Sequence, residues 1–193
     1  MARVEIVPYD ARWPGEFSDI GRTLRRALGH EAQRIDHIGS TSVPDLSAKD
    51  VIDVQVTVES LPRADRPVAA LMQEGYLPKA GIVSDHVPPG GDPAPEQWAK
   101  RFFRGPVGSR ATHVHVRGAG CANQRYALLF RDYLLAEARA AAGYEEVKRM
   151  LARHHADDIA AYYDIKDPVC DVIIAAAERW AAACEWAPGP SGA

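Results

Sequence analysis

The stretch His37-Ile38-Gly39-Ser40-Thr41-Ser42-Val43-Pro44 decides the fold, together with Asp50-Val51-Ile52-Asp53-Val54-Gln55-Val56, which follows after a short gap. A Gly-Ser turn ends one apolar segment, and the next segment carries an acidic residue within a β-branched run. Glycine lets a backbone approach a phosphate closely, and serine adds an amide and a hydroxyl that can hold it. A carboxylate between Ile52 and Val54 needs a partner for its charge. A phosphate-holding turn beside a strand-borne carboxylate is what metal-assisted nucleotidyl transfer requires.

Short apolar runs predict the strands of a mixed sheet. The clearest run is 51–58, whose even-numbered residues are apolar, whereas its odd-numbered residues include Asp53, Gln55 and Thr57. The other predicted strands are residues 4–7, which would be short, and residues 33–38, 100–104 and 112–117. Residues 79–95 are rich in Gly, Pro and Asp, which predicts a long exposed loop that is either functional or a tolerated surface insertion.

Helical spacing governs the start and the last third of the chain. Residues 13–28 carry an apolar face at helical spacing, and from Asn123 onward the pattern is helical. Asp167-Pro168 predicts the start of the last helix, and residues 188–193 are expected to be a disordered tail. The sequence therefore predicts an α/β (α+β) fold, a mixed sheet flanked by helices. We expect one domain over residues 1–187, in which residues 1–120 bear the sheet and residues 121–187 are helical.

Composition limits the classes of protein to which the chain can belong. Its 193 residues are 47% hydrophobic and 25% charged, enough to bury a core without disulfides or metals. The net charge of −3 argues against binding nucleic acid through bulk charge. Three cysteines without a pairing motif favour a reducing compartment, and no apolar run predicts a signal peptide or a membrane span. These observations predict a soluble, cytoplasmic protein with neither nucleic acid nor membrane as partner.

Asp53 and Gln55 are the first pair of candidate metal ligands. On a regular strand they share one face, with Cβ atoms about 6.6 Å apart. Two oxygen ligands at that spacing can converge on one divalent cation, although Mg²⁺ prefers carboxylates to an amide oxygen. The alternative is structural, with Asp53 forming an ion pair with Lys49 or a nearby arginine.

The segment Thr112-His113-Val114-His115-Val116-Arg117 is the second candidate. His113, His115 and Arg117 share a strand face, so two imidazoles could bind a metal, or one could act as a base while the other holds phosphate. The alternatives are a polar strand face in water and an edge strand protected by charge. Positive side chains nearby could line a triphosphate site; they are Lys100, Arg101, Arg104 and Arg110.

His154 and Asp158 are a third, weaker candidate. They lie four residues apart on one helical face, as two metal ligands could. A capped or salt-bridged helix junction explains the same spacing and is the favoured interpretation.

Several segments together resemble the GrpB family, also called UPF0157, over nearly the whole chain. They are Val7-Pro8-Tyr9-Asp10, Trp13-Pro14, His37 to Pro44, Ala48-Lys49, Ile52-Asp53, His113-Val114-His115-Val116, Leu129-Phe130-Arg131-Asp132-Tyr133-Leu134 and Lys148. That family is placed in the nucleotidyltransferase superfamily, whose fold is a mixed sheet with helices. The superfamily signature is Gly-Ser, a gap, and then two acids spaced as Asp-x-Asp or Asp-x-Glu.

The resemblance implies a site. Gly39 and Ser40 match the phosphate turn, Asp53 matches the first metal carboxylate, Gln55 stands in place of the second acid, and His115 in place of the third. The expected metal ligands are thus Asp53, Gln55 and His115. The residues expected to bind the nucleotide and its phosphates are Gly39, Ser40, Thr41, Ser42, Lys49, Arg101 and Arg104.

The expected activity is transfer of a nucleotidyl group from a nucleoside triphosphate, preferably ATP, to a small-molecule acceptor with Mg²⁺ or Mn²⁺. Asp53, His113 and His115 are the expected catalytic residues, and His113 is the candidate base. On the same site, an ATP-dependent ligase would adenylylate an acceptor carboxylate. The alternative is a non-catalytic nucleotide-binding or accessory domain, of the kind that the resemblance places in fusions with dephospho-CoA kinase.

Overall fold

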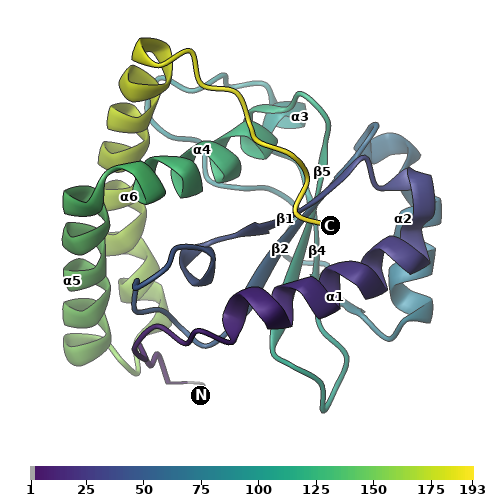
Figure 1. The fold of residues 1–193 in the computed structure, drawn as a ribbon, viewed down its shortest axis with the longest axis horizontal. Helices are drawn as coiled ribbons and strands as arrows, with labels where there is room; N and C mark the ends of the chain where they lie inside the picture. The colour runs from purple at the N-terminus through teal and green to yellow at the C-terminus, as the bar shows by residue number, and fades with distance from the viewer. Residues whose placement is uncertain (1–2) are drawn as a thin grey trace.

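The computed structural model describes residues 3–193, which form a mixed β-sheet with helices on both faces (Figure 1). The strands lie in the order β1-β2-β5-β4-β3. β2 and β5 are parallel, and every other neighbouring pair is antiparallel. The strand bounds are β1 Arg34–Ile38, β2 Ile52–Val58, β3 Leu77–Pro78, β4 Arg101–Arg104 and β5 Thr112–Gly118. The mixed sheet and its four main strands are thus confirmed.

The larger hydrophobic core lies between the sheet and the helices α1 (Trp13–Leu28) and α2 (Asp65–Gln73). Helix α1 has the predicted bounds, and it buries Trp13, Phe17, Leu24 and Leu28 at helical spacing. The even-numbered residues of β2 face the same core, as their alternation predicts. The odd-numbered face of β2 is therefore left for the opposite side of the sheet.

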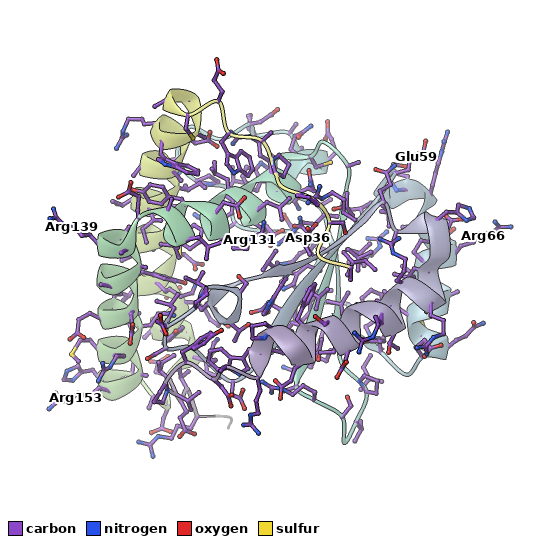
Figure 2. The ribbon with its side chains drawn as sticks, in the orientation of Figure 1. Asp36, Glu59, Arg66, Arg131, Arg139 and Arg153 are labelled. Carbon is purple, nitrogen blue, oxygen red and sulfur yellow. The ribbon has the colours of Figure 1, made fainter. Side chains whose placement is uncertain are left out.

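Helices α4 (Ala122–Ala136), α5 (Ala138–His154) and α6 (Ile159–Ala183) lie on that opposite side. A second cluster joins them to the loop after β1; it consists of Val43, Leu46, Leu134, Tyr144 and Cys170. Arg131 of α4 also donates to the backbone oxygen of His37 at 3.0 Å. Figure 2 shows Arg131 and Asp36 inside the molecule, whereas Arg139 and Arg153 point outward from α5. The Gly-Ser loop thus lies where the sheet meets the helices.

Short helical turns complete the chain: η1 Gly29–Glu31, η2 Ser40–Ser42, η3 Leu61–Arg63 and α3 Pro95–Trp98. None of the helices in the described residues is both long and apolar enough to span a membrane.

The last helix begins earlier than the sequence predicts. Asp158 is its N-cap and accepts a hydrogen bond from the amide of Ala161 at 2.9 Å, and Pro168 lies inside the helix. Proline lacks one backbone donor, but contacts of Cys170, Ile174 and Ala177 with neighbouring helices hold α6 together across that position. Asp158 is a helix cap, in agreement with the favoured interpretation of the His154–Asp158 spacing.

Backbone hydrogen bonds join residues 79–95 to the segment that leads into β4. Most of their side chains are exposed, as predicted, but the Asp85 amide donates to the backbone oxygen of Trp98 at 2.8 Å. The Lys100 amide donates to the backbone oxygen of Val83 at 2.9 Å. The Asp85 side chain points inward, onto the sheet face that carries Arg117.

Residues 188–193, which the sequence predicts as a disordered tail, instead lie against the outer edge of β1. The amide of Ile35 donates to Ser191 Oγ at 3.0 Å, and the amide of Gly192 donates to the Ile35 oxygen at 3.0 Å. Figure 1 shows the yellow C-terminal segment returning from α6 to the sheet. An uncovered strand edge carries unpaired backbone groups, so the segment protects β1 from pairing with another chain.

We therefore expect Ser191→Ala to lower the free energy of unfolding by about 1 kcal/mol, because one side-chain partner of the Ile35 backbone is lost. Urea unfolding followed by circular dichroism measures the change. Ser109→Ala, which alters an exposed turn serine, is the control and should change the value by less than about 0.5 kcal/mol. Equal effects of the two substitutions would show that the tail contact contributes nothing.

Candidate functional site

The register of the sheet places the candidate residues in one row. Asp53 lies between Ile38 of β1 and His113 of β5, and His113 lies opposite Arg104 of β4. Gly39 directly follows Ile38, so the Gly-Ser turn is at the end of the same row. Directly opposed residues on neighbouring strands share a face, which is here the face turned toward α4, α5 and α6.

The Asp53 carboxylate is held by two histidines. His113 Nδ1 lies 3.2 Å from Asp53 Oδ1, and His115 Nε2 lies 3.6 Å from the same oxygen. Burial opposes ionisation of Asp53, but the hydrogen bonds from His113 and His115 hold its pKa well below the usual range. The partners of Asp53 are thus imidazoles, rather than Lys49 or an arginine as in the structural alternative.

Gly39 has to be a glycine because Asp53 packs against it. Its φ is 72°, and a Cβ at this position would lie 2.7 Å from Asp53 Oδ2. Any side chain would therefore displace the carboxylate as well as strain the backbone. The turn and the carboxylate form one unit.

The two histidines direct different ring nitrogens at Asp53. A carboxylate only accepts, so we assign the hydrogen of His113 to Nδ1, which leaves Nε2 as its free nitrogen. His115 Nδ1 lies 3.4 Å from a donor nitrogen of Arg117, so its hydrogen is assigned to Nε2, toward Asp53. Burial lowers the pKa of His115 to about 4, and this ring is neutral at pH 7.

Gln55 does not point a free oxygen at the site, contrary to its expected role as a metal ligand. Its Oε1 accepts from Arg117 Nη1 at 2.6 Å, and its Nε2 donates to the backbone oxygen of Gln124 at 3.1 Å. The side chain is completely buried between β2 and α4. Both ends of the amide are satisfied, so Gln55 connects the sheet to α4.

The other expected phosphate contacts divide into two groups. Ser40, Lys49 and Arg104 line the cleft described below. Arg101 does not, because it lies opposite Val116 on the face that packs against α1 and α2.

The remaining two turn residues have local partners. Thr41 is buried and hydrogen-bonds through Oγ1 to His37 Nε2 at 3.0 Å, and Ser42 Oγ donates to the oxygen of Gly39 at 2.5 Å. Their side chains stabilise the turn, and Ser40 has the turn hydroxyl without a hydrogen-bond partner among the described residues, although Thr41 also lines the cleft.

A cleft of about 720 Å³ lies between this face of the sheet and the helices α4, α5 and α6. Eight lysine or arginine side chains line it, against three aspartates. This imbalance creates a positive potential inside a partly enclosed space, which attracts anions.

Three lysines form a cluster in the part of the cleft near the Gly-Ser loop, which we call the lysine cluster: Lys49, Lys148 and Lys166. Lys148 is 2% exposed and donates to the backbone oxygen of Ser47 at 2.6 Å. Burial lowers the pKa of Lys148 to about 7, with Lys166 and Lys49 adding to the effect. The acidic neighbours of the cluster are Asp167, 3.0 Å from Lys166, and Glu145, which opposes the lowering of the Lys148 pKa. The cluster thus has more basic than acidic side chains.

Sequence reasoning missed Lys148 and Lys166 as functional candidates. Lys148 lies on the buried stripe of α5, between Tyr144 and Leu151. A charged residue at helical spacing within an apolar stripe was the signal that could have found it. Asp85 gave no comparable signal, since its partners Lys100 and Arg117 lie on other segments.

The arrangement offers one carboxylate to a cation. Within residues 3–193, no three or more His, Cys, Asp or Glu side chains are arranged as a set of metal ligands. The contacts of both histidines with Asp53 end on Oδ1, whereas Oδ2 lies against Gly39 and has no histidine partner. One carboxylate oxygen suits a cation that brings its other ligands with it.

The model of the GrpB protein family matches residues 3–176. The chain belongs to the GrpB family. It is 40% identical to a dephospho-CoA kinase of Mycolicibacterium paratuberculosis over 97% of this chain and 49% of that protein. The chain thus spans about half the length of the curated relatives it matches. The crystal structure of the conserved protein GrpB from Enterococcus faecalis has a TM-score of 0.74 and 28% identity, covering 91% of this chain and 99% of that one.

A more distant structural likeness concerns the fold alone. The Cid1 poly(U) polymerase, solved with MgGTP bound, has a TM-score of 0.51 and 16% identity, covering 77% of this chain and 45% of that one. The predicted nucleotidyltransferase-like fold is thus confirmed.

The first prediction concerns the contact between Gly39 and Asp53. Gly39→Ala should lower the free energy of unfolding by more than Gly108→Ala does, because both add a Cβ at positive φ but only the first meets a side chain. We expect a difference of about 1–3 kcal/mol. Urea unfolding of the two variants measures it, and equal losses would show that Asp53 moves away freely.

The second prediction concerns pH. Burial lowers the pKa of His37 to about 4, below its unfolded value of about 6.5. As pH falls from 6.5 to 4, the unfolded chain binds the proton first, so the free energy of unfolding decreases, by about 3 kcal/mol from His37. Urea unfolding at several pH values should show a smaller decrease for His37→Gln and an unchanged one for the exposed His154→Gln. A decrease of the same size in His37→Gln would contradict the assignment.

Proposed function

We propose that the cleft binds a nucleoside triphosphate, preferably ATP, and transfers its nucleotidyl group to a small-molecule acceptor. The row of Gly39, Asp53 and His113 inside a positively charged cleft is the observation that carries this proposal. The nucleotidyltransferase-like fold supports it. A volume of about 720 Å³ lies within the usual range for sites of small molecules.

The triphosphate end of the proposed site lies at the Gly-Ser turn. Backbone amides after Gly39 and the hydroxyl of Ser40 would donate to phosphate oxygens, as small turns rich in free amides do. Lys49 and the other members of the lysine cluster would supply positive charge on the same side of the cleft. Arg104, at the other end of the row, is the candidate clamp for a phosphate nearer to the acceptor.

The transfer step uses His113 as base. An acceptor hydroxyl oxygen forms a bond to the α-phosphorus, and the bond from that phosphorus to the oxygen bridging to the β-phosphate breaks. Pyrophosphate leaves with the electron pair, and the hydroxyl proton passes to Nε2 of His113. Asp53 holds His113 through Nδ1, which fixes the ring and stabilises the imidazolium that forms.

A divalent cation, Mg²⁺ or Mn²⁺, fits this site as a companion of the triphosphate. Mg²⁺ is commonly bound by one or two carboxylates together with substrate phosphates and water, and Asp53 supplies one carboxylate. His115 could contribute only after losing the hydrogen that it now directs at Asp53. Such a cation supplies neutralisation of the charge on the phosphates.

A carboxylate acceptor would make the protein an adenylating ligase. Attack by a carboxylate oxygen on the α-phosphorus gives an acyl-adenylate and pyrophosphate. An amine could then displace the nucleotide from the acyl carbon, forming an amide.

A second candidate is a non-catalytic nucleotide-binding or accessory domain. The observation that favours it is Gln55, which stands in place of an acid and is fully bonded to Arg117 and Gln124. Relatives named dephospho-CoA kinase are about twice as long as this chain, which suits a domain that assists another one.

Pyrophosphate release separates the two candidates. The wild type, incubated with ATP, Mn²⁺ and a panel of small alcohols, amines and carboxylates, should release pyrophosphate with at least one acceptor. Asp53→Asn should lower that rate by about 100-fold or more. Asp19→Asn, an exposed carboxylate of α1 on the other side of the sheet, is the control and should keep the full rate.

Binding of ATP without pyrophosphate release by the wild type would favour the accessory domain. An active Asp53→Asn would place the chemistry elsewhere in the molecule. Circular dichroism shows whether Asp53→Asn is folded. If it is not, Asp53→Glu replaces it in the assay, because this variant keeps the charge but moves the carboxylate oxygens.

A further inference from the structure

Asn123, the second residue of α4, has a buried oxygen with no hydrogen-bond partner among residues 3–193. The side chain is 1% exposed and lines the cleft. A buried amide oxygen without a donor is rare in proteins and lowers stability unless something binds it. A donor that reaches this atom would therefore add a hydrogen bond.

The orientation of the Asn123 amide is fixed by its partners. Nδ2 donates to Asp85 Oδ2 at 3.0 Å and to the backbone oxygen of Ala99 at 2.9 Å. Both partners are acceptors, so exchanging the oxygen and nitrogen of the amide would place two oxygens against two oxygens. The unpaired atom is thus the oxygen, and it requires an N–H or O–H donor.

The neighbouring polar groups do not supply that donor in this structure. Asp85 accepts from Lys100 Nζ at 2.6 Å and from Arg117 Nε at 2.9 Å. Burial opposes ionisation of Asp85, but Arg117 and Lys100 hold its pKa well below the usual range. The ammonium and the guanidinium are thus held toward Asp85, and neither donates to Asn123 Oδ1 in this structure.

Aromatic rings surround this end of the cleft. Trp98 is 4% exposed and meets Tyr126 edge to face, with ring centres 6.3 Å apart. Trp98 Nε1 already donates to the oxygen of Asp92 at 2.6 Å, so Trp98 offers only ring surface. Phe102 of β4 lies on the same sheet face, opposite His115. Flat, mainly apolar walls beside the unpaired oxygen of Asn123 suit a planar group that carries a donor.

This aromatic end lies on the β4 side of Asp53, whereas the Gly-Ser turn lies on the β1 side. An in-line displacement at phosphorus places the attacking oxygen opposite the leaving pyrophosphate. With the phosphates at the Gly-Ser turn, the acceptor has to approach from the β4 side.

We propose that Trp98, Phe102, Asn123 and Tyr126 form the acceptor pocket. It binds a small molecule with a planar, mainly apolar part that bears an N–H or O–H donor for Asn123 Oδ1. This inference rests on the proposed function for the role of its ligand as acceptor, but the pocket itself can be tested without any nucleotide.

Indole and 1-methylindole are the probes, because they share a flat ring and a methyl group in the second replaces the N–H donor of the first. The wild type should bind indole about 10-fold more tightly than 1-methylindole, the size expected for one hydrogen bond to a buried amide. Titration followed by ¹⁵N–¹H NMR should show shifts at residues 98–102 and 123–126. Asn123→Leu, similar in volume, should lose the preference.

Thr57→Val is the matched control. Thr57 Oγ1 is also buried and unpaired within the described residues, but it does not line the cleft, so this variant should keep the preference for indole. Equal affinity of the wild type for both probes, or a preference that survives in Asn123→Leu, would overturn the pocket. If Asn123→Leu does not fold, a crystal of the wild type soaked with indole decides. The indole nitrogen within hydrogen-bond distance of Asn123 Oδ1 supports the proposal, and a water there with indole elsewhere overturns it.

The acceptor role has its own readout. Where pyrophosphate is released, indole should raise the KM for the acceptor without changing the KM for ATP. Competition with ATP instead would make the pocket a base site and overturn the acceptor assignment. If the protein prefers indole to 1-methylindole but never releases pyrophosphate, the pocket is supported and only the proposed function is refuted.

Discussion

The contact between the Asp53 carboxylate and the backbone of Gly39 is the constraint on which the rest of the site depends. It requires a glycine in the turn, and it fixes the turn against β2 through a side chain that is itself held by His113 and His115. A carboxylate so close to the proposed phosphate-binding turn would repel phosphate unless positive charge surrounded both. Eight basic side chains line the same cleft, so the lysine cluster would offset the charge of Asp53 in the proposed site.

Local sequence patterns were sufficient to predict a helix or strand where apolar residues repeat with one period along the whole element. The alternation along 51–58 and the apolar face of 13–28 predicted β2 and α1 with nearly correct bounds. The same alternation should have separated Arg101 from Arg104. Residues three apart on a strand face opposite sides, and only Arg104 lines the cleft.

Contacts between residues far apart in the chain could not be predicted from local sequence patterns. Gln55 carries the right atoms for a metal ligand, but the parallel pairing of β2 with β5 brings Arg117 near enough to take its oxygen. Contacts with α4 and α5 stabilise α6 on both sides of Pro168. The position of residues 188–193 depends on hydrogen bonds with the backbone of Ile35. Asp85 and Asn123 meet from segments 38 residues apart, which no local window detects.

A crystal structure with an ATP analogue that has a methylene group between the α- and β-phosphorus atoms, together with Mn²⁺, tests the central claim most directly. The account predicts phosphate oxygens on the backbone amides of the Gly39–Ser40 turn and an anomalous Mn²⁺ peak at bonding distance from Asp53. An analogue bound away from the turn, or a Mn²⁺ peak that Asp53 does not contact, would contradict it.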